Sequence, residues 1–319
     1  LCHVLGFTSR FGESFYGIEQ RYHGRLKGRS GLQVSLKDAH NIEFYDHRKI
    51  PKLPEEGCTI ELTIDLQVQY LVEEVLKEVI VASQAQGAWA VVQEVKTGRI
   101  LAMASHPYFD PNTYQRGSRE EYLNRVIGYT YEPGSTMKAM IFAAALNEKV
   151  IDKNALVDCE NGCWYYRNRP LRDYHAYGLL SAEDVLKKSS NIGTAKIALL
   201  LGEERLEHYL RSFGIGSRTG IDLPMEEPGI FWPRRKWDGL SISRIPMGHG
   251  VAVTALQMVN AYSAIANDGF LMRPQIIDRI LNARGGVIME FEPEVLARPI
   301  RGDTAQLLRR LLKRVTEDG

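Results

Sequence analysis

The stretch EPGSTMKAMIFAAALNEK, residues 132–149, constrains the fold of this chain most strongly. Pro133 and Gly134 form a turn signal, and the run AMIFAAAL that follows is apolar around its whole circumference. Such a run predicts a helix that is buried in the domain. The turn delivers Ser135 to the first turn of this helix, and burial of the helix would remove Lys138 from water.

The other segments show both strand and helix patterns. TIELTID (59–65) alternates like a strand, and two further strand-like runs at 89–95 and 99–105 are separated by Lys96-Thr97-Gly98, in which Gly98 suits a positive φ. Helical spacing, caps or terminal glycines predict helices at 65–84, 181–188, 191–202, 254–269 and 303–319, with Asp65, Ser181 and Thr254 as N-caps. Strands and helices without repeated β-α-β units predict an α+β fold.

The length of 319 residues indicates one large domain and a smaller piece. The Pro/Gly-rich stretch PKLPEEG (51–57) is typical of a linker, and it places a boundary between residues 1–57 and 58–319. The chain opens at LCHVLGF without an initiator Met or a signal-peptide pattern, so we expect an internal fragment whose targeting information is missing. No apolar run reaches the roughly 18–20 residues that a transmembrane helix needs.

Charge gives no support for nucleic-acid binding, because 40 Lys plus Arg balance 39 Asp plus Glu. We therefore interpret the basic aromatic stretch formed by Trp232, Arg234, Arg235 and Trp237 as a loop packed on the domain. The basic residues of RRLLKR (309–314) are interpreted as the solvated face of the last helix.

Cysteine and histidine spacing does not indicate a metal site. Cys159 and Cys163, separated by a turn, would form a local disulfide in an oxidising compartment or remain free thiols, and the sequence leaves both open. His106, Asp173 and His175 are scattered singly. We predict no metal and no cofactor.

Ser135 and Lys138 are the first candidates for chemistry. A serine hydroxyl needs an adjacent base, and a lysine three residues later lies on the same helix face. The lysine acts as a base only when it is neutral, which burial would favour. The structural alternative is an N-cap serine followed by a solvated lysine, and an isolated S-x-x-K pattern is more often that.

Ser189-Ser190-Asn191 follows Ser135 by 54 positions and lies at the junction of two predicted helices. Small polar side chains at such a junction can point into a cleft, where Ser189 would relay a proton and Asn191 would bind a substrate amide. The alternative is that these residues only cap the two helices.

S-x-x-K followed by S-x-N is the signature of serine β-lactamases and penicillin-binding proteins. The chain resembles a class B penicillin-binding protein, and the resemblance covers nearly its whole length. YEPGST and SSN resemble the division or sporulation type. The stretches that carry the resemblance occur in family order: GIEQRYHGRLKGRSG, LTIDLQVQ, TGRILAMASHPYFDPN, NRVIGYTYEPGSTMK, SSNIGTAKIA, FGIGSRTGIDLP, GHGVAVTALQMVNAYSAIAN and DGFLMRP.

The resemblance implies a penicillin-binding-protein/serine β-lactamase-like transpeptidase domain, with an antiparallel sheet, a helical subdomain and part of an N-terminal pedestal domain at 1–57. It implies Ser135 as the acylated nucleophile, Lys138 as its base and Ser189 as a proton relay. Asn191 would hold the substrate peptide. Further substrate contacts are expected at Glu132 and Gly134, which shape the turn with Pro133, and at His249, which either edges the cleft or is structural.

The third family motif, a catalytic K-T-G strand near the end of the domain, is where this sequence departs. Lys96-Thr97-Gly98 precedes the nucleophile, so we interpret it as an ordinary hairpin turn with an exposed lysine. No K-[ST]-G follows residue 98. We therefore expect that residues 58–319 lack the K-T-G strand and that the fragment itself reacts weakly or not at all with penicillin.

The implied function is a peptidoglycan D,D-transpeptidase, which crosslinks stem peptides ending in D-Ala-D-Ala and is a target of β-lactams. Implied partners are a membrane-embedded glycan polymerase and other division proteins, and the implied location is periplasmic, on a single-pass inner-membrane anchor absent from this chain. Two alternatives stay open: a β-lactamase or β-lactam sensor, which would lack residues 1–57, and a non-catalytic scaffold of the division complex.

Overall fold

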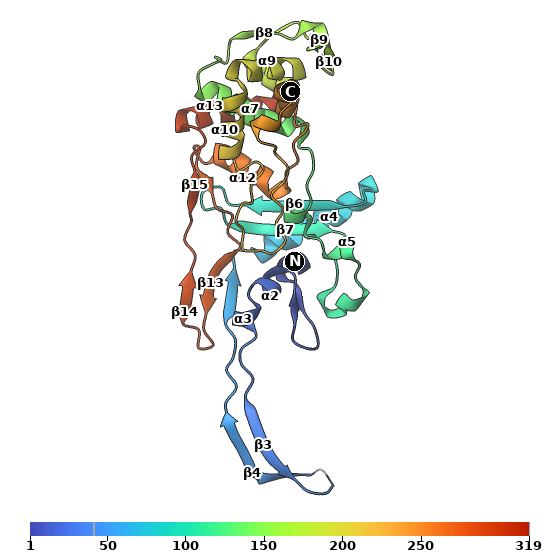
Figure 1. Cartoon of the computed structure of the whole chain (residues 1–319), viewed down its shortest axis with the longest axis vertical. Coiled ribbons are helices and arrows are strands. Elements are labelled where there is room, and N and C mark those ends of the chain that lie inside the picture. The colour runs from blue at the N-terminus through green and yellow to red at the C-terminus, as the bar shows by residue number, and fades with distance from the viewer. Residues whose placement is uncertain (41, 319) are drawn as a thin grey trace.

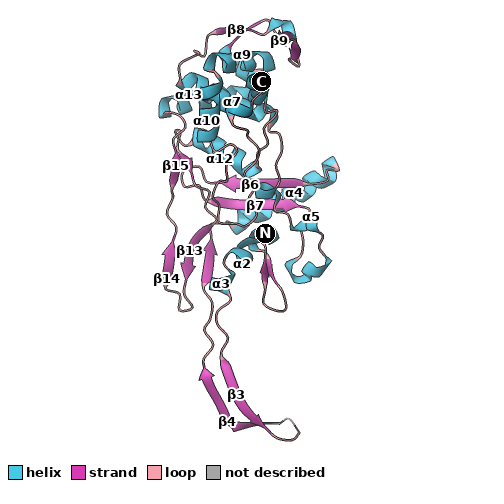
Figure 2. Cartoon of the chain, in the orientation of Figure 1, coloured by secondary structure: helices cyan, strands magenta, loops and turns pink. Residues whose placement is uncertain are grey.

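The computed structural model describes residues 1–40 and 42–318 and has the predicted α+β fold (Figure 1). Most helices gather at one end of the elongated molecule, and the larger strand pairs lie in the middle and at the other end (Figure 2). Every pair of named strands in the described residues is antiparallel. No helix in these ranges is long and apolar enough to cross a membrane.

The helical end is built around α7 (Lys138–Asn147), in which every residue from 138 to 146 is buried. The apolar run therefore forms the buried helix that the sequence predicts. The larger helices around it are α8 (Ala182–Lys187), α9 (Asn191–Leu201), α10 (Glu203–Ser212), α12 (Ala255–Ala266) and α13 (Gly302–Asp318). Small elements complete this end: β8 (Leu156–Asp158), β9 (Cys163–Tyr166), β10 (Arg169–Arg172), β11 (Leu179–Ser181) and α11 (Ser241–Arg244).

The middle of the molecule contains the predicted hairpin of β6 (Ala88–Gln93) and β7 (Ile100–His106), with α4 (Leu66–Ser83) packed against it. Asp65 caps α4 as predicted, because its side chain accepts hydrogen bonds from the backbone N–H groups of Gln67 and Val68. Two short helices, α5 (Arg119–Tyr122) and α6 (Arg125–Gly128), follow β7.

A three-stranded sheet has β13 (Ile277–Leu281) in its centre, between β5 (Thr59–Leu62) and β14 (Val287–Glu290). An isolated parallel bridge between Arg99 and Gln275 joins this sheet region to the β6–β7 hairpin. A smaller pair, β12 (Leu271–Met272) with β15 (Val295–Ala297), leads back to the helical end.

The N-terminal residues pack on the hairpin region rather than standing apart from it. Val4 and Ile18 are buried in one apolar cluster with Ile100 and Met103. The short elements of this segment are α1 (Cys2–Leu5), β1 (Phe7–Thr8), β2 (Ser14–Phe15), α2 (Gly17–Arg21) and α3 (His23–Leu26). A division of the chain at residues 57 and 58 stays a prediction.

A two-stranded ribbon of β3 (Leu32–Lys37) and β4 (Glu43–Lys52) projects from this segment and forms the lower tip of the molecule in Figure 1. Its apolar side chains Leu32, Val34, Leu36 and Phe44 are each at least half exposed. The prediction that 51–57 is entirely linker is wrong at its start, because cross-strand pairing extends β4 to Lys52, which lies opposite Leu32.

Candidate active site

Ser135 lies in η2 (Gly134–Met137), a single 3₁₀ turn that leads directly into α7. Gly134 adopts a positive φ of 58°, a backbone conformation that glycine reaches without strain. The hydroxyl of Thr136 donates to the carbonyl of Pro133 (2.6 Å), and the hydroxyl of Tyr262 on α12 donates to the carbonyl of Thr136 (2.8 Å). These bonds hold the turn in place and leave the side chain of Ser135 exposed.

Lys138, the first residue of α7, is only 1% exposed. Its Nζ donates to the backbone carbonyl of Ser189, to Ser189 Oγ (2.9 Å) and to Asn191 Oδ1 (2.8 Å). The ammonium group therefore has three acceptors, which equals its number of N–H donors. Burial lowers the pKa of Lys138 to about 8, although the charge of Asp173 opposes this shift.

Ser189, Ser190 and Asn191 form the joint between α8 and α9. One of them caps α9, and the other two form hydrogen bonds with Lys138. Ser190 is the N-cap of α9, where its Oγ accepts a hydrogen bond from the N–H of Gly193 (2.9 Å). Ser189 has a positive φ of 54°, uncommon for a residue with a side chain, and it bonds Lys138 together with Asn191. The capping alternative is thus correct for Ser190, while its two neighbours face the lysine.

Asp173 belongs to this site, which the sequence did not reveal. Its Oδ1 accepts from the backbone N–H groups of Asn191 (2.5 Å) and Ile192 (3.0 Å), and its Oδ2 accepts from Ser190 Oγ (2.6 Å). A carboxylate at the N-terminus of α9 is stabilised by the free N–H groups of the first turn. Asp173 reaches this position because the β9–β10 hairpin ends just before it, and no short motif signals that placement.

Glu132 and His249 meet at the rim of the site. Glu132 Oε1 accepts from the N–H of Gly250 (2.8 Å), and its Oε2 lies 3.2 Å from His249 Nδ1. These contacts lower the pKa of Glu132, and the hydrogen bond from the Gly250 N–H has the largest effect. His249 is exposed and lines two cavities next to the site, so its side chain has the cleft-edge position that the sequence left open.

Gly248 and Gly134 make the closest backbone approach at this rim. A Cβ on Gly248 would lie 2.3 Å from both the N and the O of Gly134. Gly248 also has a positive φ of 76°. The glycine before His249 is therefore required for the turn that presents Ser135.

Cys159 and Cys163 are free thiols in this structure. Cys159 is fully buried and its Sγ lies 3.3 Å from Ser190 Oγ, whereas Cys163 is partly exposed. Burial raises the pKa of the Cys159 thiol. The sequence did not indicate that this cysteine lies against the α8–α9 joint.

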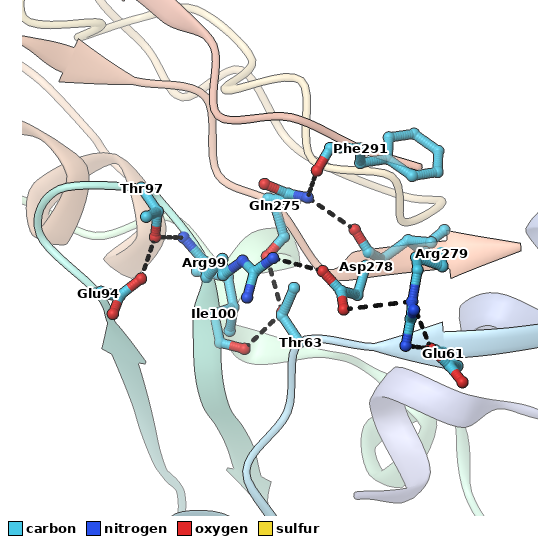
Figure 3. Close-up of polar contacts among 11 residues, drawn as sticks. Glu61, Thr63, Glu94, Thr97, Arg99, Ile100, Gln275, Asp278, Arg279 and Phe291 are labelled. Carbon is cyan, nitrogen blue, oxygen red and sulfur yellow. Dashed lines mark hydrogen bonds and ion pairs between the residues drawn. The ribbon is translucent and has the colours of Figure 1, made fainter. Parts of the chain in front are cut away.

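Lys96-Thr97-Gly98 forms the β6–β7 turn, as predicted (Figure 3). The hydroxyl of Thr97 donates to Glu94, and the carbonyl of Gly98 accepts from the N–H of Gln275 (3.0 Å). Lys96 is exposed. Within the described ranges, no hydrogen bond joins this turn to the acceptors of Lys138.

The arginine after this turn is part of a structural polar network. Arg99 bonds Asp278 (2.5 Å), and Arg279 of β13 bonds Glu61 of β5 (2.8 Å), as Figure 3 shows. Thr63 Oγ1 lies within hydrogen-bond distance of the carbonyls of Ile100 and Gln275. These contacts fasten the hairpin to the three-stranded sheet.

The basic aromatic loop packs on the domain only in part: Trp237 contacts the helical core, whereas Trp232, Arg234 and Arg235 are exposed. The indole N–H of Trp237 donates to the carbonyl of Trp232 (2.8 Å), and Arg234 lies 3.7 Å from Glu204 on α10. In the last helix, Arg314 forms an ion pair with Glu183 of α8 and Arg309 pairs with Asp268. Part of the RRLLKR stretch therefore contacts the domain rather than only solvent, because α13 packs against α8 and α12.

A family model described as the penicillin binding protein transpeptidase domain matches residues 88–319. The chain belongs to this family. Among its curated relatives, the "Probable peptidoglycan D,D-transpeptidase PenA" of Neisseria gonorrhoeae is 31% identical over 99% of the chain and 52% of its own length. "Stage V sporulation protein D" of Bacillus subtilis is 32% identical over 100% of the chain and 50% of its own length.

Solved structures of penicillin-binding proteins share the fold of this chain. Penicillin binding protein 3 from Mycobacterium tuberculosis, in its apo form, superposes with a TM-score of 0.89 at 29% identity, covering 100% of this chain and 68% of that one. The same protein is known in complex with aztreonam and with ampicillin. The chain spans about half the length of the curated relatives it matches.

Proposed function

We propose that this chain forms the acylating site of a peptidoglycan D,D-transpeptidase, with Ser135 as nucleophile and Lys138 as its base. The observation that carries the proposal is the buried ammonium of Lys138, which is held by Ser189 and Asn191 and has a pKa of about 8. A pKa near the working pH is what general-base catalysis requires. The names of the relatives support this reaction class.

In the proposed acylation, neutral Lys138 removes the proton from Ser135 Oγ while that oxygen attacks the carbonyl carbon between the two D-alanines. The first-turn N–H of Ser135 has no acceptor within the helix and donates to the developing oxyanion. The tetrahedral intermediate then expels the terminal D-alanine. Its amine nitrogen receives the proton that Lys138 holds, passed on by the hydroxyl of Ser189.

The product is an ester between Ser135 and the shortened stem peptide. An amine of a neighbouring stem peptide attacks this ester, loses a proton to Lys138 and forms the crosslinking amide, which restores the serine hydroxyl. Asn191 and the rim formed by Glu132, Gly134 and His249 are proposed to position the donor peptide. A β-lactam imitates the donor, because its ring amide opens on Ser135 and leaves a stable acyl-enzyme. No step calls for a metal or cofactor.

The test is labelling of the complete protein, produced from its full gene, with a fluorescent penicillin. We expect one label per molecule, located on Ser135 by peptide mass spectrometry. Ser135→Ala and Lys138→Met are expected to abolish labelling, whereas Ser83→Ala, the same type of change at an exposed hydroxyl on α4, should leave it intact. Labelling that persists in Ser135→Ala would refute the proposal.

Turnover separates the proposed transpeptidase from a β-lactamase, and cell-wall crosslinking separates it from a scaffold. A β-lactamase would hydrolyse a chromogenic cephalosporin repeatedly, whereas a transpeptidase or a sensor is labelled once. A scaffold without catalysis would support normal cell-wall crosslinking with alanine at position 135.

We further propose that the protein works outside the cytoplasm on a single-pass membrane anchor, together with a membrane-embedded glycan polymerase and other division proteins. The similarity to a sporulation protein and to "Peptidoglycan D,D-transpeptidase FtsI" of Escherichia coli, 30% identical over 87% of the chain, supports a role of this kind. Co-purification of the complete protein with the polymerase from detergent-solubilised membranes tests it.

A further inference from the structure

A cavity of about 260 Å³ lies directly beside the proposed catalytic residues. Asn191 forms part of its wall and connects it to the site, because its Oδ1 accepts from Lys138 and its Nδ2 donates to the backbone carbonyl of Arg172 (2.9 Å). The cavity is lined by three arginines, Arg169 and Arg172 on β10 and Arg244 on α11, and by His249.

Within the described residues, the three arginines form no ion pair with a neighbouring carboxylate. All three side chains are exposed, and within the described residues none of their guanidinium groups has an ion pair or hydrogen bond. Asp173 is held by the N-terminus of α9, and Glu132 by Gly250 and His249.

A third carboxylate, Asp238, does act on the charge of Arg244, but its hydrogen bonds come from Ser241 and Leu240. The chain as a whole has a net charge of only +1, so the arginine cluster is a local excess of positive charge. Such a concave positive site attracts and orients an anionic ligand.

We propose that this cavity binds a side-chain carboxylate of the donor stem peptide, on the residue that precedes the D-Ala-D-Ala pair. This inference rests on the proposed transpeptidase function. Guanidinium groups bind carboxylates through two parallel N–H bonds. The side chain of a diamino dicarboxylic acid carries such a carboxylate next to its ammonium, whereas lysine has only the ammonium, which the cluster repels. The geometry therefore favours a diamino dicarboxylic acid over lysine as the third residue of the substrate.

Three penicillins with one scaffold test this charge preference. Carbenicillin, benzylpenicillin and ampicillin carry a carboxylate, a hydrogen and an ammonium at the same side-chain carbon. We expect Arg172→Gln and Arg244→Gln each to slow acylation by carbenicillin about fivefold, the effect of about 1 kcal/mol for one charge contact. The loss with benzylpenicillin should be smaller, and ampicillin should react no more slowly than with the unchanged protein.

Arg284→Gln, an exposed change in the β13–β14 turn, is the matched control and should alter none of the three rates. Equal losses for all three penicillins in Arg172→Gln would overturn the inference. A complete absence of labelling by benzylpenicillin in the unchanged protein would instead refute the proposed function.

Donor peptides provide a second readout. D-alanine release is measured from two peptides ending in D-Ala-D-Ala, one with lysine and one with diaminopimelate as the preceding residue. We expect faster release from the diaminopimelate peptide and loss of that preference in the Arg172→Gln, Arg244→Gln double variant. Equal release from both peptides, or faster release from the lysine peptide, would contradict the proposed carboxylate site.

Discussion

Lys138, the proposed base, shows at the level of one residue what burial does to the charge of a lysine. A lysine in water is almost entirely charged at pH 7, whereas a pKa of about 8 leaves about one molecule in ten neutral. The acylation rate should therefore rise about tenfold per pH unit below pH 8 and level off above it. The measurement is the second-order rate constant for benzylpenicillin between pH 6 and 9.5. A flat profile over this range would exclude Lys138 as the base.

Asp173 influences the pH range over which the acylation rate rises, which is called the rising limb below. Its negative charge favours the charged form of Lys138, so Asp173→Asn should lower the pKa of Lys138 further and shift the rising limb to lower pH. The same change weakens the cap of α9 and should cost about 0.5–2 kcal/mol of stability, measured by urea unfolding.

A shift of the limb separates electrostatic coupling from a purely structural effect, because loss of stability alone does not move a pKa. Asp152→Asn is the control, since that exposed carboxylate only accepts from the N–H of Asn154. An unchanged limb in Asp173→Asn would show that the coupling is negligible.

Residue-scale prediction from sequence succeeds where a motif is local and fails where it is not. The apolar run that directly follows Lys138 predicts that this lysine is buried, and its side chain is only 1% exposed. Asp173 lies 18 positions before Asn191 and enters the site through the β9–β10 hairpin. Only the packing of that hairpin reveals the contact.

At the scale of an element, the turn η2 depends on the glycines around His249. Gly248→Ala should abolish acylation, because the new Cβ would meet the backbone of Gly134 at 2.3 Å and displace the turn that presents Ser135. Gly250→Ala is a matched control: it has a similar positive φ of 72° but no atom within 4 Å of the new Cβ.

Both alanines suffer the same backbone strain, about 1 kcal/mol or more at a left-handed position. The difference in acylation rate between the two variants therefore isolates the contact with Gly134. Both rates are measured with a fluorescent penicillin, alongside melting temperatures. Equal rates would show that η2 does not depend on this contact.

Helix starts were predictable because caps are local. Asp65, Ser181 and Thr254 each cap the helix that the sequence assigned to them. The end of β4 could not be predicted in this way, because its extension to Lys52 depends on pairing with Leu32, 20 positions away. Pro51 in the same stretch is tolerated because this ribbon has only two strands, each of which is an edge.

At the scale of the whole molecule, stability should differ sharply between the ribbon and the core. An isolated two-stranded ribbon is marginally stable in water, and the apolar side chains of β3 are half exposed. In hydrogen–deuterium exchange, amides of β3 and β4 should exchange within minutes, while those of α7 stay protected. Slow exchange in the ribbon would show that it is covered in solution.

The fold class followed from the sequence, but the packing of the N-terminal segment did not. Val4 is completely buried against the hairpin region, although its surroundings in the sequence show no periodic pattern. Short irregular segments lack the repeat from which burial is predicted, so their contacts become visible only in three dimensions.

Two of the four free cysteines, Cys159 and Cys163, offer a way to measure motion at the α8–α9 joint of the proposed active site. Cys159 is fully buried and contacts Ser190, whereas Cys163, four residues later, is partly exposed to solvent. A small thiol reagent can modify Cys159 only in molecules whose α8–α9 joint has transiently opened, while Cys163 reports the intrinsic speed of the reagent. The ratio of the two modification rates therefore measures how often the joint opens, and it can be measured with no foreign label, before and after treatment with a β-lactam.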